Sequence, residues 1–413
     1  MHYIDELETE DLKGKKILLR LDLNVPVKDG QVADDFDIQK IIPTIDFLRE
    51  YDAQTIIISH IENAKFEPTS LLPVFDCLKG YFPVEFCPTY FTPEAIDKLL
   101  KLENKGVLLF ENVRNNLGEV SNDQGFAKKL SQMADIFVND AFGVSHRKHA
   151  SIVGIPQFLP HYGGLLMQQE IKCLSRVFNP ARPFVFILGG SKFETKIPLI
   201  KKYIEKADKV FVAGAIANDI FKARGFEVGT SLISNSAFDN SILQNPKLVT
   251  PVDVTVTKPE TLGVGGLSAQ AGEATRHPSV EFKKSDKVQS NEYIVDVGPK
   301  TLGQLRELLK NAKTVVWNGP LGNYEAGFGD KTEQLAKILA SLGAGKEDSL
   351  GVGSTLNSPS ADSAEVIIGG GDTLASINKL NLTNLFSFVS TGGGAMLQFL
   401  LDETLVGIEA LEK

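Results

Sequence analysis

The sequence is poor in cysteine, and the few cysteines are scattered. Its 413 residues include only Cys77, Cys87 and Cys173, with no C-x-x-C pair and no Cys/His spacing. An odd, small number of cysteines in a chain of this length excludes a disulfide framework, and the absence of paired spacings excludes a zinc site of the usual kind. We therefore expect a protein of a reducing compartment, most simply the cytoplasm.

Long apolar runs and an excess of positive charge are also missing. No run approaches the ~18–20 apolar residues that cross a bilayer, and the acidic first segment, MHYIDELETEDLKGKK, lacks the basic and then apolar pattern of a secretory signal. With 43 Lys and Arg against 52 Asp and Glu, the formal net charge is −9. We therefore expect neither nucleic acid nor a membrane as a partner, although a local basic pocket stays open.

Two familiar nucleotide-binding motifs are absent. There is no G-x-x-x-x-G-K-[ST], which excludes a P-loop nucleotidase, and no G-x-G-x-x-G lies between a strand and a helix, which leaves a dinucleotide fold poorly supported. No Ser/His/Asp arrangement or cysteine in a basic setting supplies a nucleophile. Chemistry that needs only positioning and charge neutralisation, such as direct phosphoryl transfer, is therefore favoured.

Short β-branched runs alternate with helical segments along the chain. This pattern predicts parallel sheets covered on both faces, and about ten such strands are too many for one sheet, so we expect an α/β protein with two domains. One helix is expected over 161–178, and exposed loops over 258–289 and 342–364. The expected strand regions are 15–27, 54–60, 107–114, 135–143, 183–190, 209–215, 247–256, 314–320, 365–371 and 386–394.

Glycine runs follow three of these strands and precede helical segments, at 189–190, 369–371 and 392–394. Such a junction exposes backbone N–H groups at the positive end of a helix, where phosphate is the usual anion. Tight turns are the alternative, but three junctions in one domain favour phosphate binding. Asp372 is either an N-cap or a Mg²⁺ ligand against a nucleotide phosphate, and we favour the metal. Lys192 and Lys196 are four residues apart, so their ammonium groups lie on one helical face. Either this face is exposed to solvent, or the two ammonium groups neutralise a phosphate.

Polar residues in the first half of the chain lie at or just beyond expected strand ends. They are Asp22, Asn24, His60, Arg114, His146, Arg147 and His149. In parallel α/β folds ligands bind at the carboxyl ends of the strands. Each residue alone is explained by a structural role, but together they outline a pocket for a small anion with hydroxyl groups.

Taken in order, these segments resemble the phosphoglycerate kinase family over essentially the whole chain. The motifs are RLDLNVP, ENVR, NDAFGVSHRKHAS, LGGSKFETKI, PVDV, DVGPKT, VVWNGPLGNYE, IIGGGDT and VSTGGGA. The resemblance implies two Rossmann-like lobes with parallel sheets, joined by a hinge helix and able to bend there. It places the phosphoglycerate-binding lobe at 1–165, the hinge at 166–182 and the nucleotide-binding lobe at 183–394, with the tail 395–413 packing back on the first lobe.

The resemblance also implies an activity and its site residues. The reaction is reversible phosphoryl transfer between 1,3-bisphosphoglycerate and ADP, giving 3-phosphoglycerate and ATP, with Mg²⁺, in a cytoplasmic monomer. Substrate would be held by Asp22, Asn24, His60, Arg114 and Arg147. The adenosine site would be lined by Gly214, Asn318, Pro320 and Glu325. The nucleotide phosphates, the metal and the transferring phosphoryl group would contact Gly190, Lys192, Lys196, Gly370, Gly371, Asp372, Thr373, Gly393 and Gly394. Of these, the catalytic residues would be Lys192, Lys196, Gly371, Gly393 and Gly394. Asp372 would bind the metal.

Two segments depart from the family pattern. Where the family reads DDFRI this chain reads DDFDI, with Asp37 in place of an arginine, and SHLGRP becomes SHIENA, with Glu62 for glycine and Asn63 for arginine. Loss of an arginine that acts in the transition state costs about 10³–10⁵ in rate by analogy with arginine fingers, and Lys65 lacks the guanidinium fork. Three hypotheses stay open: an active kinase, a weakened nucleotide-binding relative, and a phosphotransferase with another acceptor.

Overall fold

The computed structural model describes residues 1–62, 69–234, 238–259, 279–343 and 363–413. It divides into two compact units: unit 1 comprises Met1–Cys173 and Asp402–Lys413, and unit 2 comprises Leu174–Leu401. Within these ranges, no helix combines the length and the apolar character needed to cross a membrane. Asn63 and Lys65, and most of the expected loops 258–289 and 342–364, lie outside the described residues.

Unit 1 is built on a six-stranded sheet in the order β5-β6-β4-β1-β7-β8, with every pair parallel. Its strands are β1 (Lys16–Arg20), β4 (Gln54–Ile58), β5 (Glu85–Cys87), β6 (Val107–Phe110), β7 (Ile136–Asn139) and β8 (His161–Gly163). Leu18 pairs with Ile56 on one side and Phe137 on the other. The central strands are buried except for the first residues of β1 and β4, because helices cover both faces of the sheet.

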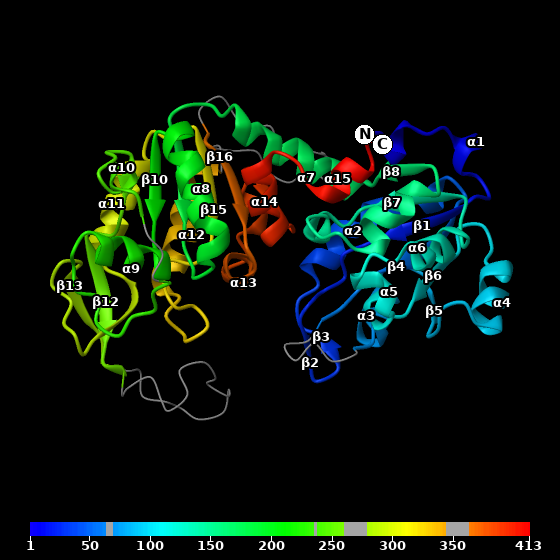
Figure 1. Ribbon diagram of the computed structural model, residues 1–413, viewed down its shortest axis with the longest axis horizontal. Helices are drawn as coiled ribbons and strands as arrows, with labels where there is room; N and C mark the ends of the chain where they lie inside the picture. Colours follow the sequence, from blue (N-terminus) through cyan, green and yellow to red (C-terminus); the bar gives the residue numbers. More distant parts are fainter. Residues whose placement is uncertain (63–68, 235–237, 260–278, 344–362) are drawn as a thin grey trace. The chain divides into compact units, whose positions relative to one another are not determined.

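The helices of unit 1 divide between two cores, one on each face of this sheet (Figure 1). Alternate strand residues separate accordingly: Ile17 and Leu19 lie in one core and Leu18 in the other. The first core takes residues of α2 (Phe36–Glu50) and α3 (Leu72–Leu78), and the second takes residues of α4 (Pro93–Lys101) and α6 (Gln124–Ser131). The unit also contains α1 (Thr9–Leu12), α5 (Leu117–Val120), α15 (Val406–Ala410) and a hairpin of β2 (Val27–Lys28) with β3 (Gln31–Val32).

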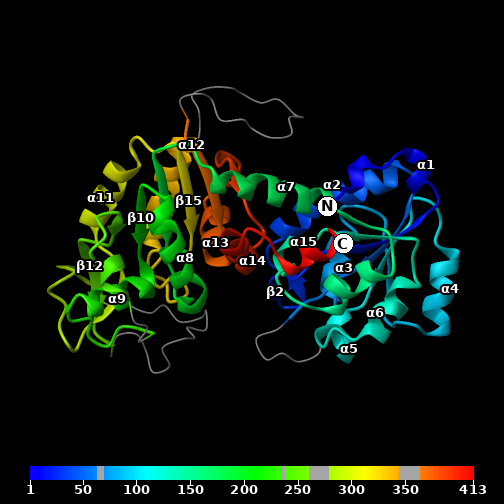
Figure 2. The same cartoon turned by 45° about the horizontal axis from the view of Figure 1, so that its top comes forward.

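The C-terminal segment is part of unit 1. Gly407 donates its amide hydrogen to the carbonyl oxygen of Ser145 at 2.8 Å, and Leu411 is buried in the second core. Figures 1 and 2 both show the two chain ends close together in this unit.

The expected helix over 161–178 is wrong at both ends. The chain forms β8 first, then α7 (Leu165–Ser175), then a 3₁₀ turn over Arg176–Phe178. The break falls at Gly163 and Gly164. A side chain at Gly164 would overlap the carboxyl group of Asp140, so a strand end packed closely on β7 replaces the first helical turn.

Unit 2 contains a second all-parallel sheet in the order β11-β10-β9-β15-β16-β17. Its strands are β9 (Phe184–Leu188), β10 (Lys209–Val212), β11 (Leu248–Val249), β15 (Thr314–Asn318), β16 (Glu365–Gly369) and β17 (Phe388–Val389). Its helices, several of which surround β10 and β15 in Figure 2, are α8 (Phe193–Lys206), α9 (Gly214–Ala223), α10 (Asn240–Leu243), α11 (Pro299–Leu309), α12 (Asp330–Gly343), α13 (Gly371–Lys379) and α14 (Gly394–Asp402).

A small antiparallel sheet in unit 2 corrects the prediction of a single strand over 247–256. That segment splits at Pro251 into β11 and β12 (Asp253–Thr257). β12 pairs antiparallel with β13 (Glu281–Lys284) and β14 (Tyr293–Val297). Proline has no N–H with which to continue a ladder, so the chain leaves one sheet there and enters another. β13 lies inside the region 258–289 that was expected to be loop.

Candidate functional site

The carboxyl edge of the unit 1 sheet gathers the polar residues that follow its strands. Asp22 follows β1 and His60 follows β4; His60 Nδ1 lies 3.7 Å from Asp22 Oδ1 and 3.2 Å from Arg20 Nη2. The amide of Asn24 donates to Asp22 Oδ1 at 3.3 Å, and Asn24 Oδ1 accepts from the amide of Glu62 at 2.9 Å. One linked cluster therefore joins the ends of neighbouring strands.

Two arginines complete this cluster through Glu62. Arg114, just beyond β6, forms an ion pair between its Nη1 and Glu62 Oε1, and Arg147 Nη1 lies 3.4 Å from the same oxygen. The five residues expected to hold substrate, Asp22, Asn24, His60, Arg114 and Arg147, are thus linked by contacts that run through Glu62. Glu62 itself was noted only as a departure from a motif.

Several side-chain nitrogen atoms here are buried without a hydrogen-bond partner among the described residues. They are Arg114 Nε and Nη2, and the ring nitrogens His60 Nε2, His146 Nδ1 and His149 Nδ1, whereas Arg114 Nη1 has only its ion pair with Glu62. Burial, with Arg147 and Arg20 nearby, lowers the pKa of Arg114 to about 10, and burial with Arg20 lowers the pKa of His60 well below its usual value. Unsatisfied buried donors are costly, so the cluster fits an anion that offers several oxygens.

A buried network behind the cluster escaped the sequence analysis. Arg20 is wholly buried at the end of β1, and its Nε donates to Ser151 Oγ at 2.8 Å, while Ser151 donates in turn to Glu119 Oε1 at 2.5 Å. Glu119 is also wholly buried. The signal available in the sequence was an arginine inside the apolar strand KILLR, which requires a buried counter-charge.

Asp37 lies in the first turn of α2, on the same edge of the unit. Its Oδ1 is buried without a hydrogen-bond donor among the described residues. Burial, together with Asp22, Glu170 and Asp34, raises the pKa of Asp37 to about 7. A carboxyl group with this pKa is partly neutral at physiological pH, so the repulsion expected of this departure is weaker than a full negative charge would give.

The first glycine junction of unit 2 differs from the expectation of exposed amides. After β9, Gly189 donates its N–H to the carbonyl of Asn318 at 3.0 Å, and Gly190 donates to the carbonyl of Pro320 at 2.8 Å. A side chain at Gly189 would overlap the carbonyl oxygen of Pro320. These glycines therefore allow close packing of neighbouring loops, and their amides are already used.

The junctions after β16 and β17 do present free amides. Gly371 begins α13 and Gly394 begins α14, and among the described residues neither these amides nor that of Gly393 donates to a backbone carbonyl. A side chain added at any of these three glycines would meet no atom within 4 Å. Each helix has nine residues and an open N-terminus, which is a suitable site for a phosphate group.

Two lysines follow the first glycine junction, the one after β9, and they lie in different environments. Lys192 is the exposed residue before α8, whereas Lys196 is 4% exposed and donates from Nζ to the carbonyl of Gly189 at 2.5 Å. Burial and Lys192 lower the pKa of Lys196 to about 8. Lys196 therefore carries a cation beside the loops after β9 and β15, where Gly319 also lies against its ammonium group.

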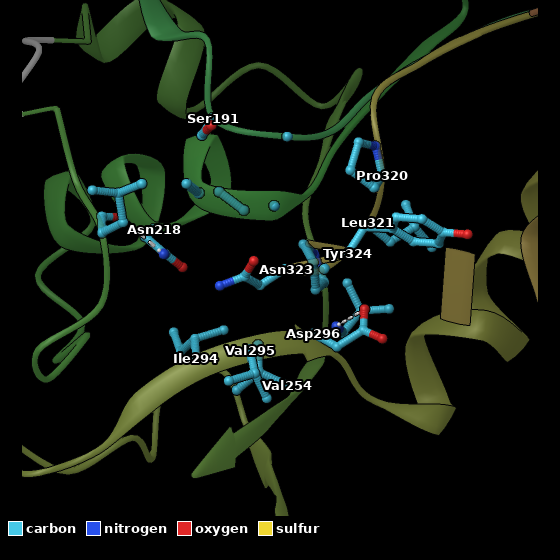
Figure 3. A pocket seen from close by; sticks show the side chains of 18 of the residues that line it. Ser191, Asn218, Val254, Ile294, Val295, Asp296, Pro320, Leu321, Asn323 and Tyr324 are labelled. Carbon is cyan, nitrogen blue, oxygen red and sulfur yellow. Dashed lines mark hydrogen bonds between the residues drawn. The ribbon is translucent and has the colours of Figure 1, made fainter. Parts of the chain in front are cut away.

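A cavity of about 260 Å³ lies beside these loops (Figure 3). Figure 3 shows the polar side chains of Asn218, Asn323 and Asp296 among apolar ones such as Ile294 and Leu321. The expected site residues that line it are Gly190, Gly214, Pro320, Glu325 and Asp372. The expected residues Asn318 and Thr373 are buried beside it: a side chain at Gly370 would meet the Asn318 amide, and Thr373 Oγ1 accepts from the amide of Gly319 at 2.9 Å.

Much of the apolar lining was missed by sequence reasoning. Phe221, Leu232, Val254 and Ile294 come from helices, loops and strands far apart in sequence. Of these lining residues, Val254 and Asp296 belong to the family motifs PVDV and DVGPKT, and membership of a motif was the one signal that the sequence offered for them. Burial raises the pKa of Asp296 to about 7, so this carboxyl group is partly neutral within the cavity wall.

The donor set for a metal is sparse. The described parts of the chain contain no group of three His, Cys, Asp or Glu side chains placed to hold a metal ion. Asp372, exposed in the first turn of α13, is the carboxylate of the cavity lining that lies at a helix N-terminus. This arrangement fits Mg²⁺, which takes one or two carboxylates and completes its shell with phosphate oxygens and water.

Comparison with known proteins identifies the family. The family model described as phosphoglycerate kinase matches residues 7–403. Phosphoglycerate kinase of Borrelia garinii subsp. bavariensis is 38% identical over 409 residues, covering 97% of each chain, and that of Thermosipho africanus is 39% identical, covering 97% of this chain and 96% of the relative.

Solved structures agree with this result. The structure of phosphoglycerate kinase from Coxiella burnetii aligns with a TM-score of 0.74 at 35% identity, covering 99% of this chain and 98% of that one. The enzyme from Pyrococcus horikoshii aligns with a TM-score of 0.80 at 28% identity, covering 100% and 98%. The matches extend over both units, and the chain therefore belongs to the phosphoglycerate kinase family.

Proposed function

We propose that this chain catalyses reversible transfer of a phosphoryl group between 1,3-bisphosphoglycerate and ADP, giving 3-phosphoglycerate and ATP. Its acceptor is a carboxyl group, which is the chemistry of its family. The observation that carries the proposal is the presence of two complementary sites in one chain. Unit 1 has a cluster of buried Arg114 and histidine nitrogen atoms, and unit 2 has a cavity lined by Asp372 of α13 together with two open helix N-termini, those of α13 and α14. A cytoplasmic, monomeric enzyme is part of the proposal.

The unit 1 cluster is proposed to bind 3-phosphoglycerate. Arg114 and Arg147 offer guanidinium groups to its phosphate or carboxylate, because both already contact a carboxylate oxygen, that of Glu62. His60 offers a neutral ring at pH 7, since its pKa lies well below the usual value. Asp22 and Asn24 supply hydrogen-bond partners for the hydroxyl group of the glycerate.

The unit 2 cavity is proposed to bind the adenine nucleotide. Its apolar walls, including Ile294 and Leu321, suit the flat base, and Glu325 and Asn323 offer partners for the ribose. From the cavity, Asp372 and the first turn of α13 lead toward phosphates. Mg²⁺ held by Asp372 would neutralise charge on the phosphate oxygens when bound.

Transfer then depends on positioning and on charge neutralisation. A phosphoryl group in flight spreads negative charge over its equatorial oxygens, and fixed donors stabilise that charge without reorganising. The free amides of Gly393 and Gly394 and the ammonium group of Lys196 are the proposed donors. Lys196 keeps its proton at pH 7 because its pKa is about 8.

The test is a coupled assay with 3-phosphoglycerate and Mg-ATP. Turnover within about tenfold of the ~10 s⁻¹ typical of enzymes supports the proposal. ATP binding without turnover would instead identify a weakened, nucleotide-binding relative, and turnover with a different carboxylate acceptor would identify a changed specificity.

A second test addresses the two departures directly. The double variant Asp37→Arg and Asn63→Arg restores the residues of the family pattern. We expect higher activity or tighter phosphoglycerate binding, because two guanidinium groups are added where the substrate is anionic. No gain in either quantity would show that these positions do not limit the reaction.

A further inference from the structure

Glu62 holds the position that an anionic ligand would take on unit 1. Its carboxylate oxygen contacts the Nη1 atoms of both Arg114 and Arg147. The Arg114 side chain is only 8% exposed and the Glu62 side chain 25% exposed, so the contact is largely shielded from solvent. The arginine pair is thus already occupied by a negative charge from the chain itself.

Hydrogen bonds fix the peptide group between Ile61 and Glu62. The amide of Glu62 donates to Asn24 Oδ1 at 2.9 Å. The carbonyl of Ile61 accepts from Asn112 Nδ2 at 2.7 Å and from Thr69 Oγ1 at 3.0 Å. Rotation of the Glu62 side chain would release the arginines to an anion while this peptide group keeps its hydrogen bonds.

The arginines themselves need a counter-charge. Arg147 and Arg20 both lie close enough to lower the pKa of Arg114, so the guanidinium groups repel each other in a partly buried place. Apart from its ion pair with Glu62, no nitrogen of the Arg114 guanidinium forms a hydrogen bond among the described residues. Glu62 stabilises the empty cluster, and for the same reason it competes with any anionic ligand.

We propose that Glu62 acts as an internal competitor for the arginine pair of the acceptor site, and thereby sets the affinity for the anionic group of the acceptor. This inference rests on the proposed function for the identity of the acceptor, but the competition with anions does not depend on it. Every phosphate or carboxylate that binds the two arginines must displace the Glu62 side chain, so its affinity is lowered by the same factor.

The experiment compares Glu62→Gln and Glu62→Gly with a matched control. Glu94→Gln removes the same charge from an exposed position in the first turn of α4, away from the arginines. Isothermal titration of each protein with 3-phosphoglycerate and with inorganic phosphate measures binding without turnover. We expect both Glu62 variants to bind 3-phosphoglycerate and phosphate at least tenfold more tightly than the wild type, and Glu94→Gln to stay within twofold.

In thermal unfolding, the rise in melting temperature caused by added phosphate is a readout that a purely structural role would not increase. Without ligand, Glu62→Gln should melt at a lower temperature than Glu94→Gln, because the arginines lose their counter-charge. Added phosphate should raise its melting temperature more than that of the wild type, because a ligand bound to the folded state stabilises it in proportion to its affinity.

The outcomes separate this inference from the proposed function. Unchanged or weaker phosphate and 3-phosphoglycerate binding in both Glu62 variants overturns the role of Glu62, whatever the activity. Tighter phosphate binding in both variants, with no turnover of 3-phosphoglycerate by any of the proteins, supports the role of Glu62 and overturns the proposed reaction.

Discussion

Asp37 makes the stability of unit 1 depend on pH in a direction that the structure predicts. Its carboxyl lies in the first turn of α2, where the helix dipole favours the charged form. Burial and the carboxylates of Asp22, Glu170 and Asp34 outweigh the dipole and Lys40, and they raise the pKa of Asp37 to about 7. The pKa of Asp37 is thus higher in the folded state than in the unfolded state. The contribution of this carboxyl group to the free energy of unfolding is therefore fully present below about pH 4, and it is lost as the pH rises through about 7.

The magnitude follows from this pKa. Between pH 5.5 and pH 8.5 the ionisation of Asp37, with its pKa of about 7, lowers the free energy of unfolding by about 2 kcal/mol. This value comes from about 1.36 kcal/mol for each pH unit between pH 5.5 and that pKa. The side chain of Asp37 keeps some contact with solvent, so we take about half, ~1 kcal/mol. The variant Asp37→Asn resembles the neutral acid and removes this dependence. It should therefore gain ~1 kcal/mol relative to the wild type on going from pH 5.5 to pH 8.5.

The assay is equilibrium unfolding in urea at these two pH values, followed by far-ultraviolet circular dichroism. Asp46→Asn on the same helix is the matched control, because that carboxylate is exposed and paired only with Arg49 among the described residues. The chain's one tryptophan, Trp317, is buried in β15 of unit 2, so its fluorescence reports unit 2 separately. An advantage of Asp37→Asn that is equal at both pH values would refute the reasoning.

Two further predictions concern buried charges. Glu119→Gln should lower the free energy of unfolding by about 3 kcal/mol, because it removes the larger of the two negative charges, Glu119 and Asp22, that act on the buried Arg20. Ser151→Ala should cost only ~1–2 kcal/mol. A loss below about 1 kcal/mol for Glu119→Gln in urea unfolding would contradict the network. Lys196→Met should lower kcat by about 10²-fold or more with little change in nucleotide affinity, because its cation stabilises charge in transfer. Lys201→Met, an exposed change on the same helix, should leave kcat unaltered, and equal effects of the two variants would argue against this role.

The fold class was readable from the sequence, because it depends on local pattern. Continuous apolar runs such as KILLR and TVVWN mark strands buried on both faces, and helical segments between them require parallel sheets. The failures came where one residue changes the direction of the chain. Pro251 ends one strand and starts another in a different sheet, and Gly164 ends a strand where a helix was expected.

The candidate site was readable in part. The five residues expected to hold the acceptor form a linked cluster, because all follow strands of one parallel sheet and such strand ends meet at one edge. The apolar wall of the unit 2 cavity was not readable, since residues such as Phe221 and Ile294 carry no chemical signature and come together only through packing.

By itself the sequence determined the two α/β sheets, the glycine junctions and the polar residues at strand ends, because these are properties of a few consecutive residues. Only the tertiary structure decided what those residues do. It uses the amides of Gly189 and Gly190 in packing and leaves those of Gly393 and Gly394 free. The fold brings Arg20 into a hydrogen bond with Ser151, which is 131 residues away, and brings Arg147 into contact with the carboxylate of Glu62, which is 85 residues away. The charge and hydrogen bonding of such groups depend on which strand ends meet, and no local pattern contains that information.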